Sequence, residues 1–175
     1  MTPSTLPDAP GCVTTIEGAE RVETGGFVVA EVIRDGPRGP EIMARRITHN
    51  LVVNTGKRQL WRIASGLNST KVFDQGRIGT SGASPNSGHT NVLSPVTGTL
   101  NTVDSVTLLS GTRTARWIWS YPSGAGSKSA AGIDEAAILN ENTSPGGSAL
   151  MRSTFTAVNK TTADKLKLSY FSRVT

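Results

Sequence analysis

The stretch GIDEAAILNENTSPGGSALMRSTF, residues 132–155, holds two apolar runs separated by a break rich in glycine, proline and small polar residues. Within the break, Pro145 fixes one backbone dihedral angle and the glycine pair after it permits a positive φ, as turns require. Ile133 and the alanines and aliphatic residues after it supply one buried side, and Leu150 to Phe155 return antiparallel. The stretch therefore predicts a β-hairpin.

Asp134 and Glu135 are adjacent at the start of this hairpin. Successive side chains of a strand point to opposite faces, so these two cannot act on one substrate across ~5 to 9 Å, as the carboxylates of a glycosidase do. We interpret both as structural carboxylates and assign no catalytic role to either.

Further strand-like segments lie on both sides of the hairpin. They are 27–34 and 42–53, joined by a longer loop at 35–41, then a short strand around VFDQGRIGTSG, and finally 96–109, 112–122 and 165–174. In NTGKRQLWRIASGL, by contrast, Leu60, Ile63, Ala64 and Leu67 follow helical spacing, and Gly66 marks the end of one short helix. Seven to nine strands with one helix predict a mainly-β fold, an antiparallel β-sandwich of jelly-roll-like type.

The N-terminal segment differs in composition from the rest. Residues 1–25 contain Pro3, Pro7 and Pro10 and show neither strand nor helix periodicity, so they predict an extended arm before a β-sandwich domain at 26–175. We expect the arm to contact another subunit, which makes the three prolines candidate interface residues.

Trp117 and Trp119 alternate with polar or aliphatic neighbours in the strand-like segment TRTARWIWSYP. An exposed pair of rings could stack on sugars or bases, but rings that share one strand face are more often buried in a core or a subunit interface. We favour the buried alternative by about three to one on that general tendency and retain both as candidate interface residues.

The composition argues against several function classes. The net charge is +5, but the basic residues are dispersed rather than clustered, so we expect a solvated surface and no direct nucleic-acid binding. Cys12 is the only cysteine and leaves no intrachain disulfide or thiolate metal site. No apolar run is long enough for a membrane span and no secretion signal is evident, so we expect a soluble protein made in the cytoplasm.

Residues for catalysis or cofactor binding are also few. The two histidines, His49 and His89, lie too far apart in sequence for a metal-binding pair, and Ser81 lacks the sequence of a nucleophile elbow. No phosphate-binding glycine motif occurs. We therefore predict that the protein is not an enzyme and has no metal and no cofactor.

The order of several short motifs resembles that of a family of small structural proteins of tailed bacteriophages. The motifs are HNLVVNTGKRQLWRIASG, RIGTSGASPNSGHTNVL, TARWIWSY and the segment from IDEAAILN to LKLSYFSRV, and the likeness covers residues 27–174. Arg152-Ser153 departs from the family pattern, which has Ala-Arg there, and Ile138-Leu139 stands where an aromatic residue is common.

This resemblance implies a virion component rather than an enzyme. Its leading implication is a capsid decoration, or cement, protein on the capsid exterior, bound to the major capsid protein as a dimer or trimer. The alternative is a neck, tail or fibre component that contributes to host attachment through loop 80–95 or an exposed Trp117/Trp119 face.

Overall fold

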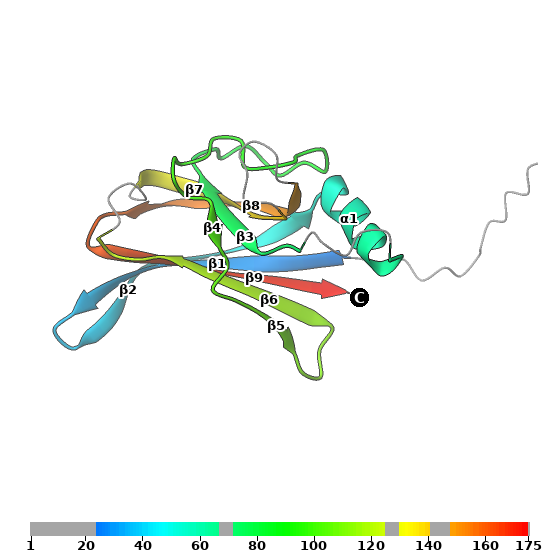
Figure 1. Ribbon diagram of the computed structural model, residues 1–175. Coiled ribbons are helices and arrows are strands. Elements are labelled where there is room, and N and C mark those ends of the chain that lie inside the picture. Colours follow the sequence, from blue (N-terminus) through cyan, green and yellow to red (C-terminus); the bar gives the residue numbers. More distant parts are fainter. Residues whose placement is uncertain (1–23, 67–71, 125–129, 141–147, 175) are drawn as a thin grey trace, which may run out of the picture.

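The computed structural model describes residues 24–66, 72–124, 130–140 and 148–174, which form nine β-strands and one α-helix (Figure 1). The strands are β1 (Thr24–Gly36), β2 (Gly39–Val52), β3 (Gln75–Gly79), β4 (Asn101–Thr102), β5 (Ser105–Leu109), β6 (Thr114–Tyr121), β7 (Ala130–Leu139), β8 (Ala149–Lys160) and β9 (Asp164–Val174). The helix, α1, spans Asn54–Ala64. The predicted mainly-β class with one short helix is confirmed.

All nine strands belong to one antiparallel sheet, in the order β4-β3-β7-β8-β2-β1-β9-β6-β5. The sheet curls on itself, so that β3, β7 and β8 lie opposite β1, β9 and β6 (Figure 1). β2 joins the two layers, because most of its length pairs with β1 whereas Leu51 and Val52 pair with β8. The antiparallel arrangement is confirmed, but the layers are halves of one curled sheet rather than the separate sheets of the expected jelly-roll-like sandwich.

The hydrophobic core fills the space between these layers. Alternation along β9 delivers three fully buried side chains to it: Leu166, Leu168 and Tyr170. Trp119 of β6 stacks on Tyr170 with ring centroids 5.3 Å apart. The Tyr170 hydroxyl donates a 2.7 Å hydrogen bond to the carbonyl of Ala136 in β7, which fastens the two layers to each other.

Gly76 of β3 shows how closely the layers approach. A Cβ at this position would overlap ring atoms of the Trp119 indole. Gly76 also accepts, through its carbonyl, a weak 3.5 Å contact from the Tyr121 hydroxyl. The glycine is therefore a packing requirement of the core rather than a turn residue.

The hairpin of residues 132–155 forms as expected from β7 and β8, and the break between them lies in 141–147, outside the described residues. The hairpin of β1 and β2 is tighter than predicted. Gly36 pairs with Gly39, so only Pro37 and Arg38 form the turn instead of a loop at 35–41. Gly39 adopts a φ of 110°, which glycine tolerates without a Cβ clash. The predicted strand at 96–109 is reduced to the short strands β4 and β5.

Helix α1 forms where the sequence predicted it, but it packs through a different face. Gly56 and Gln59 are buried, whereas Leu60 and Trp61 are exposed. A Cβ at Gly56 would overlap the backbone of Leu150 in β8, so the helix can approach the strand only through a glycine. This close approach outweighs the apolar periodicity to which Leu60 belongs. The side chains of Ile63 and Ala64 are not described, and Leu67 lies outside the described residues.

The expected domain boundary lies close to the first described residue. β1 begins at Thr24, whereas the sequence suggested a domain from residue 26. Residues 1–23 of the predicted arm, including its three prolines, lie outside the described part of the chain.

A buried carboxylate joins the ends of β1 and β9. Arg34 Nε donates to Asp164 Oδ1 at 2.8 Å, and the hydroxyl and amide of Thr161 donate to Oδ2 at 2.6 and 2.9 Å. The hydrogen bond from Arg34 is the largest influence and, with those from Thr161, lowers the pKa of Asp164 to about 2 although burial opposes this. The folded state thus favours the charged carboxylate.

We expect stability to fall in acid because of this group. The pKa of Asp164 lies below the ~3.9 of an unfolded aspartate, so its contribution is present above about pH 4 and is lost as the pH falls towards 2. Asp164→Asn should lower the free energy of unfolding at pH 7 and flatten its decline between about pH 4 and 2, as measured by urea titration. The exposed Asp35→Asn variant is the control and should keep the wild-type pH profile.

We expect Gly76→Ala to destabilise the fold by about 1 to 3 kcal/mol, because the added methyl group must displace the Trp119 ring. Gly25→Ala in β1 is the matched control, since a Cβ there meets nothing within 4 Å, and it should change stability by less than about 0.5 kcal/mol. Chemical denaturation measures both. Equal effects of the two variants would show that the close contact at Gly76 is unimportant.

Candidate functional site

Trp117 and Trp119 lie in the core region of a single chain. Trp119 has no exposed surface, and its Nε1 donates to the Tyr121 hydroxyl at 3.1 Å. Trp117 is half-buried, packs against the core and donates from Nε1 to the carbonyl of Phe73 at 3.0 Å. The buried alternative thus holds for Trp119, and its candidate interface role is corrected. Pro3, Pro7 and Pro10 lie outside the described residues.

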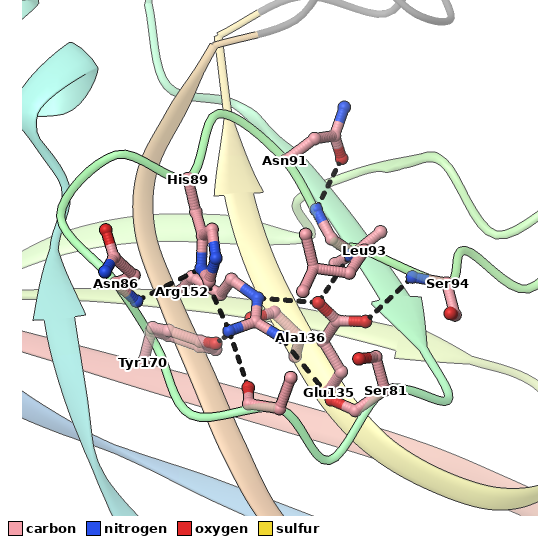
Figure 2. Close-up of polar contacts among 12 residues, drawn as sticks. Ser81, Asn86, His89, Asn91, Leu93, Ser94, Glu135, Ala136, Arg152 and Tyr170 are labelled. Carbon is pink, nitrogen blue, oxygen red and sulfur yellow. Dashed lines mark hydrogen bonds and ion pairs between the residues drawn. The ribbon is translucent and has the colours of Figure 1, made fainter.

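The most concentrated group of polar side chains lies on the opposite surface of β7 and β8, away from the main core. Glu135 and Arg152 are both completely buried, and Arg152 Nε donates to Glu135 Oε1 at 2.6 Å (Figure 2). Arg152 pairs across the hairpin with Ala137, so it shares a sheet face with Glu135, two residues away. The two charges therefore form a buried ion pair within the hairpin that decides the fold.

The covering loop, residues 80–100, encloses this pair. The amides of Leu93 and Ser94 donate to Glu135 at 2.6 and 3.3 Å, one to each carboxylate oxygen. Arg152 donates to the carbonyls of Ala83 at 2.9 Å and Ser81 at 3.4 Å. Both ends of the ion pair thus bind the loop backbone, and the loop follows the outer surface of β7 and β8 (Figure 2).

His89 completes the contacts of Arg152. Its Nδ1 lies 3.2 Å from Arg152 Nη1 and accepts a 3.1 Å hydrogen bond from the amide of Asn86. A guanidinium nitrogen and a backbone amide can only donate, so Nδ1 must accept from both and the ring proton must reside on Nε2. His89 therefore serves as a hydrogen-bond acceptor that connects Arg152 to the loop backbone.

Asp134 does not behave as simple strand alternation predicts. The register of β7 and β8 shifts between Ile133 and Glu135, and a Cβ at Gly82 would lie 3.1 Å from Asp134 Oδ2. Both neighbouring carboxylates therefore approach the covering loop instead of opposite sides of the sheet. Burial, followed by the charge of Glu135, raises the pKa of Asp134.

A second polar group holds the far end of the covering loop. The Tyr121 hydroxyl donates to the carbonyl of Thr99 at 2.6 Å, and the Thr99 hydroxyl lies within hydrogen-bonding distance of the carbonyls of Val96 and Ile78. Burial is the main cause that raises the pKa of Tyr121 above its usual range. The loop is thus attached to the β-sheet near both of its ends.

This geometry gives the polar cluster a structural character. Glu135 accepts three hydrogen bonds and its partner Arg152 donates to four groups, so neither is available to a substrate without breaking the loop contacts. Among the described residues, no three His, Cys, Asp or Glu side chains are grouped as metal ligands. In the same part of the chain, no helix has the length and apolar character needed to cross a bilayer.

Comparisons with protein-family models, curated proteins and solved structures found no match to this chain.

The ion pair was not predicted from the sequence, in which Glu135 was interpreted only as a structural carboxylate at the start of a strand. A signal was present: once 132–155 is recognised as a hairpin, Arg152 is the single cation of that stretch and lies in the strand that faces Glu135. Opposite charges in facing strands of a buried hairpin are expected to pair. The contacts with residues 80–94 had no comparable signal.

We expect Arg152→Met to destabilise the protein by about 3 to 5 kcal/mol, because it leaves the Glu135 carboxylate buried without its cation. The double variant Glu135→Gln with Arg152→Met should recover part of this loss, since no uncompensated charge remains. Hydrogen exchange at the amides of Leu93 and Ser94 should accelerate in both variants, as they lose their charged acceptor or its support.

The surface pair of Arg45 and Glu31 provides the control. Its atoms lie 3.5 Å apart and Arg45 is largely exposed, so Arg45→Met should cost no more than about 1 kcal/mol. A loss of stability at Arg152 no greater than that at Arg45 would contradict a central role for the buried pair.

Proposed function

We propose that this chain is a structural protein of a bacteriophage virion, and more narrowly a capsid decoration protein that binds the major capsid protein lattice as a homo-oligomer. The motif order in residues 27–174, which resembles that of phage structural proteins, motivates the proposal. In this proposal the protein supports the shell mechanically and has no catalytic role.

The structural observation that carries the proposal is the apolar surface of β5. This strand ends the sheet order, and its Val106 and Leu108 side chains are 52% and 81% exposed. An edge strand offers unpaired backbone groups to another chain, and exposed large apolar side chains next to it favour a protein contact. β5 and β6 project below the body of the molecule as a hairpin (Figure 1).

The hairpin of β1 and β2 also extends beyond the layers, on the other side of the molecule (Figure 1). Ile42 and Met43 lie near its tip and are more than half exposed. Two projecting hairpins with apolar side chains suit a protein that contacts its support at separated points. On a lattice of identical sites, weak contacts of this kind reinforce one another through multivalency.

The charge of the protein is compatible with such a support. The net charge of +5 favours association with an acidic surface, of the kind that capsid exteriors commonly present. Long-range attraction of this type accelerates docking more than it strengthens the final contact. The apolar hairpins would then supply most of the affinity.

The alternative is a neck, tail or fibre component that contributes to host attachment. Fewer of the surfaces expected to bind a host remain available for it. Trp119 is buried, so an exposed Trp117/Trp119 platform is not present on the described surface. Loop 80–95 remains, but Glu135 and Arg152 hold its backbone to the sheet. We therefore place this function second.

Counting copies in purified virions tests the proposal. A decoration protein covers the lattice and should be present on the order of hundreds of copies per particle, as multivalent attachment to a shell requires. Quantitative mass spectrometry against the major capsid protein gives this number. A count that matches a single ring at one vertex would refute the decoration role and favour the neck or tail.

We expect Leu108→Asp to weaken binding to heads that lack this protein by about tenfold or more, because a charge would enter an apolar contact. Thr107→Asp is the matched control: it adds the same charge to the next residue of β5, which is also exposed but points to the other side. Co-sedimentation with the heads measures the binding of both variants. Equal losses of binding would show that an added charge, and not the loss of an apolar contact at Leu108, weakens the interaction.

A further inference from the structure

The layer formed by β2, β1, β9, β6 and β5 has a second face that points away from the core. Alternation and the strand register place five apolar side chains together on this face, which we call the outer patch: Phe27, Val29, Ile47, Ile118 and Phe171. Phe27 and Phe171 stack with ring centroids 4.4 Å apart, and Phe27 and Ile47 are 40% and 61% exposed, whereas Val29 between them is buried. No described element lies over this side of the layer (Figure 1).

Basic residues surround the outer patch. Five of them share the same face by register, and we call them the basic rim: Arg45, Arg116, Lys165, Lys167 and Arg173. The acidic residue in the same rows is Glu31, which is already paired with Arg45 at 3.5 Å. The face is therefore apolar at its centre and positive around it, which suits an acidic partner with apolar side chains.

Residues 1–23 of the chain have this chemistry. They contain the acidic residues Asp8, Glu17, Glu20 and Glu23 and one basic residue, Arg21, a net charge of −3. Since the whole chain carries +5, residues 24–175 carry +8. Leu6, Val13, Ile16 and Val22 supply apolar side chains in the same segment. Fully extended, 23 residues reach about 75 Å, enough to cross onto another copy.

We propose that residues 1–23 of a neighbouring copy bind across the outer patch, with their acids against the basic rim and their apolar side chains against the phenylalanines and isoleucines. Two outer patches could not face each other as well, since each basic rim would meet another. A mixture of complementary variants distinguishes docking onto a neighbouring copy from docking onto the same copy.

This inference deepens the proposed function, because it names the contact that holds the homo-oligomer together. It can nevertheless fail alone, since it is tested in solution without phage particles. Conversely, a chain that oligomerises through the outer patch but is absent from capsids would leave the contact standing and refute the decoration role.

Sedimentation velocity of the full chain tests the contact. We expect a dimer or trimer near physiological salt that dissociates at about 1 M salt, where charges are screened beyond ~3 Å. Ile47→Asp, which alters the patch, and the triple variant Glu17→Lys, Glu20→Lys, Glu23→Lys, which alters the arm, should each weaken association at least tenfold. Circular dichroism checks that both remain folded, and Lys167→Glu on the rim provides a second, independent substitution.

A mixing experiment identifies which copy supplies the segment. The triple arm variant keeps an intact patch and Ile47→Asp keeps an intact arm, so an equimolar mixture should recover mixed oligomers that neither variant forms alone. Leu108→Asp is the control and should leave the oligomer unchanged, because Leu108 points to the other side of its layer. A wild-type chain that stays monomeric, or an oligomer that survives both variants, would overturn the proposal.

Discussion

The buried pair of Glu135 and Arg152 imposes the most demanding condition on this structure. Two charges removed from water are tolerated only when each finds its counterion and enough further hydrogen bonds. The hairpin of β7 and β8 supplies the charges but not the remaining partners. The carbonyls of Ser81 and Ala83 and the amides of Leu93 and Ser94 supply those, so the hairpin is complete only with the covering loop in place. A long segment without regular structure thereby acquires a fixed course.

The sequence predicted the secondary structure better than the contacts between its parts. Alternation in 165–174 and the break after Leu139 revealed strands because each is a local pattern of backbone and burial. The curled single sheet was not foreseen, since it depends on Leu51 and Val52 leaving one layer to pair with β8. No local pattern encodes such a change of partner.

Two contacts made through glycines were not predicted from the sequence, and both have one physical cause. Gly56 and Gly76 lie in segments that were predicted from their apolar residues. The glycines nevertheless decide how closely α1 approaches β8 and how closely β3 approaches Trp119. A missing side chain leaves no signature in hydrophobic periodicity. The candidate site was foreseen only in part for a related reason: the ion pair combines residues 17 positions apart with backbone groups more than 40 positions away.

The molecule buries charged side chains and exposes large apolar ones. Its strongest charge pair is sealed under a loop, whereas large apolar side chains remain on projecting hairpins and on an uncovered sheet face. An enzyme generally places reactive polar groups in an accessible hollow and covers its apolar surface. The reverse distribution would suit the structural role proposed above.

The position of β9 has a consequence for how the protein is made. β9 lies between β1 and β6 in the sheet, with Thr24 of β1 opposite Val174. During synthesis β1 emerges early, but its neighbour β9 appears only after all the other described strands have been translated. The lower layer must therefore stay open until residues 164–174 have been synthesised and can pair with both β1 and β6. Pairing between strands distant in sequence slows folding, and until it is complete the partly folded chain is prone to aggregation.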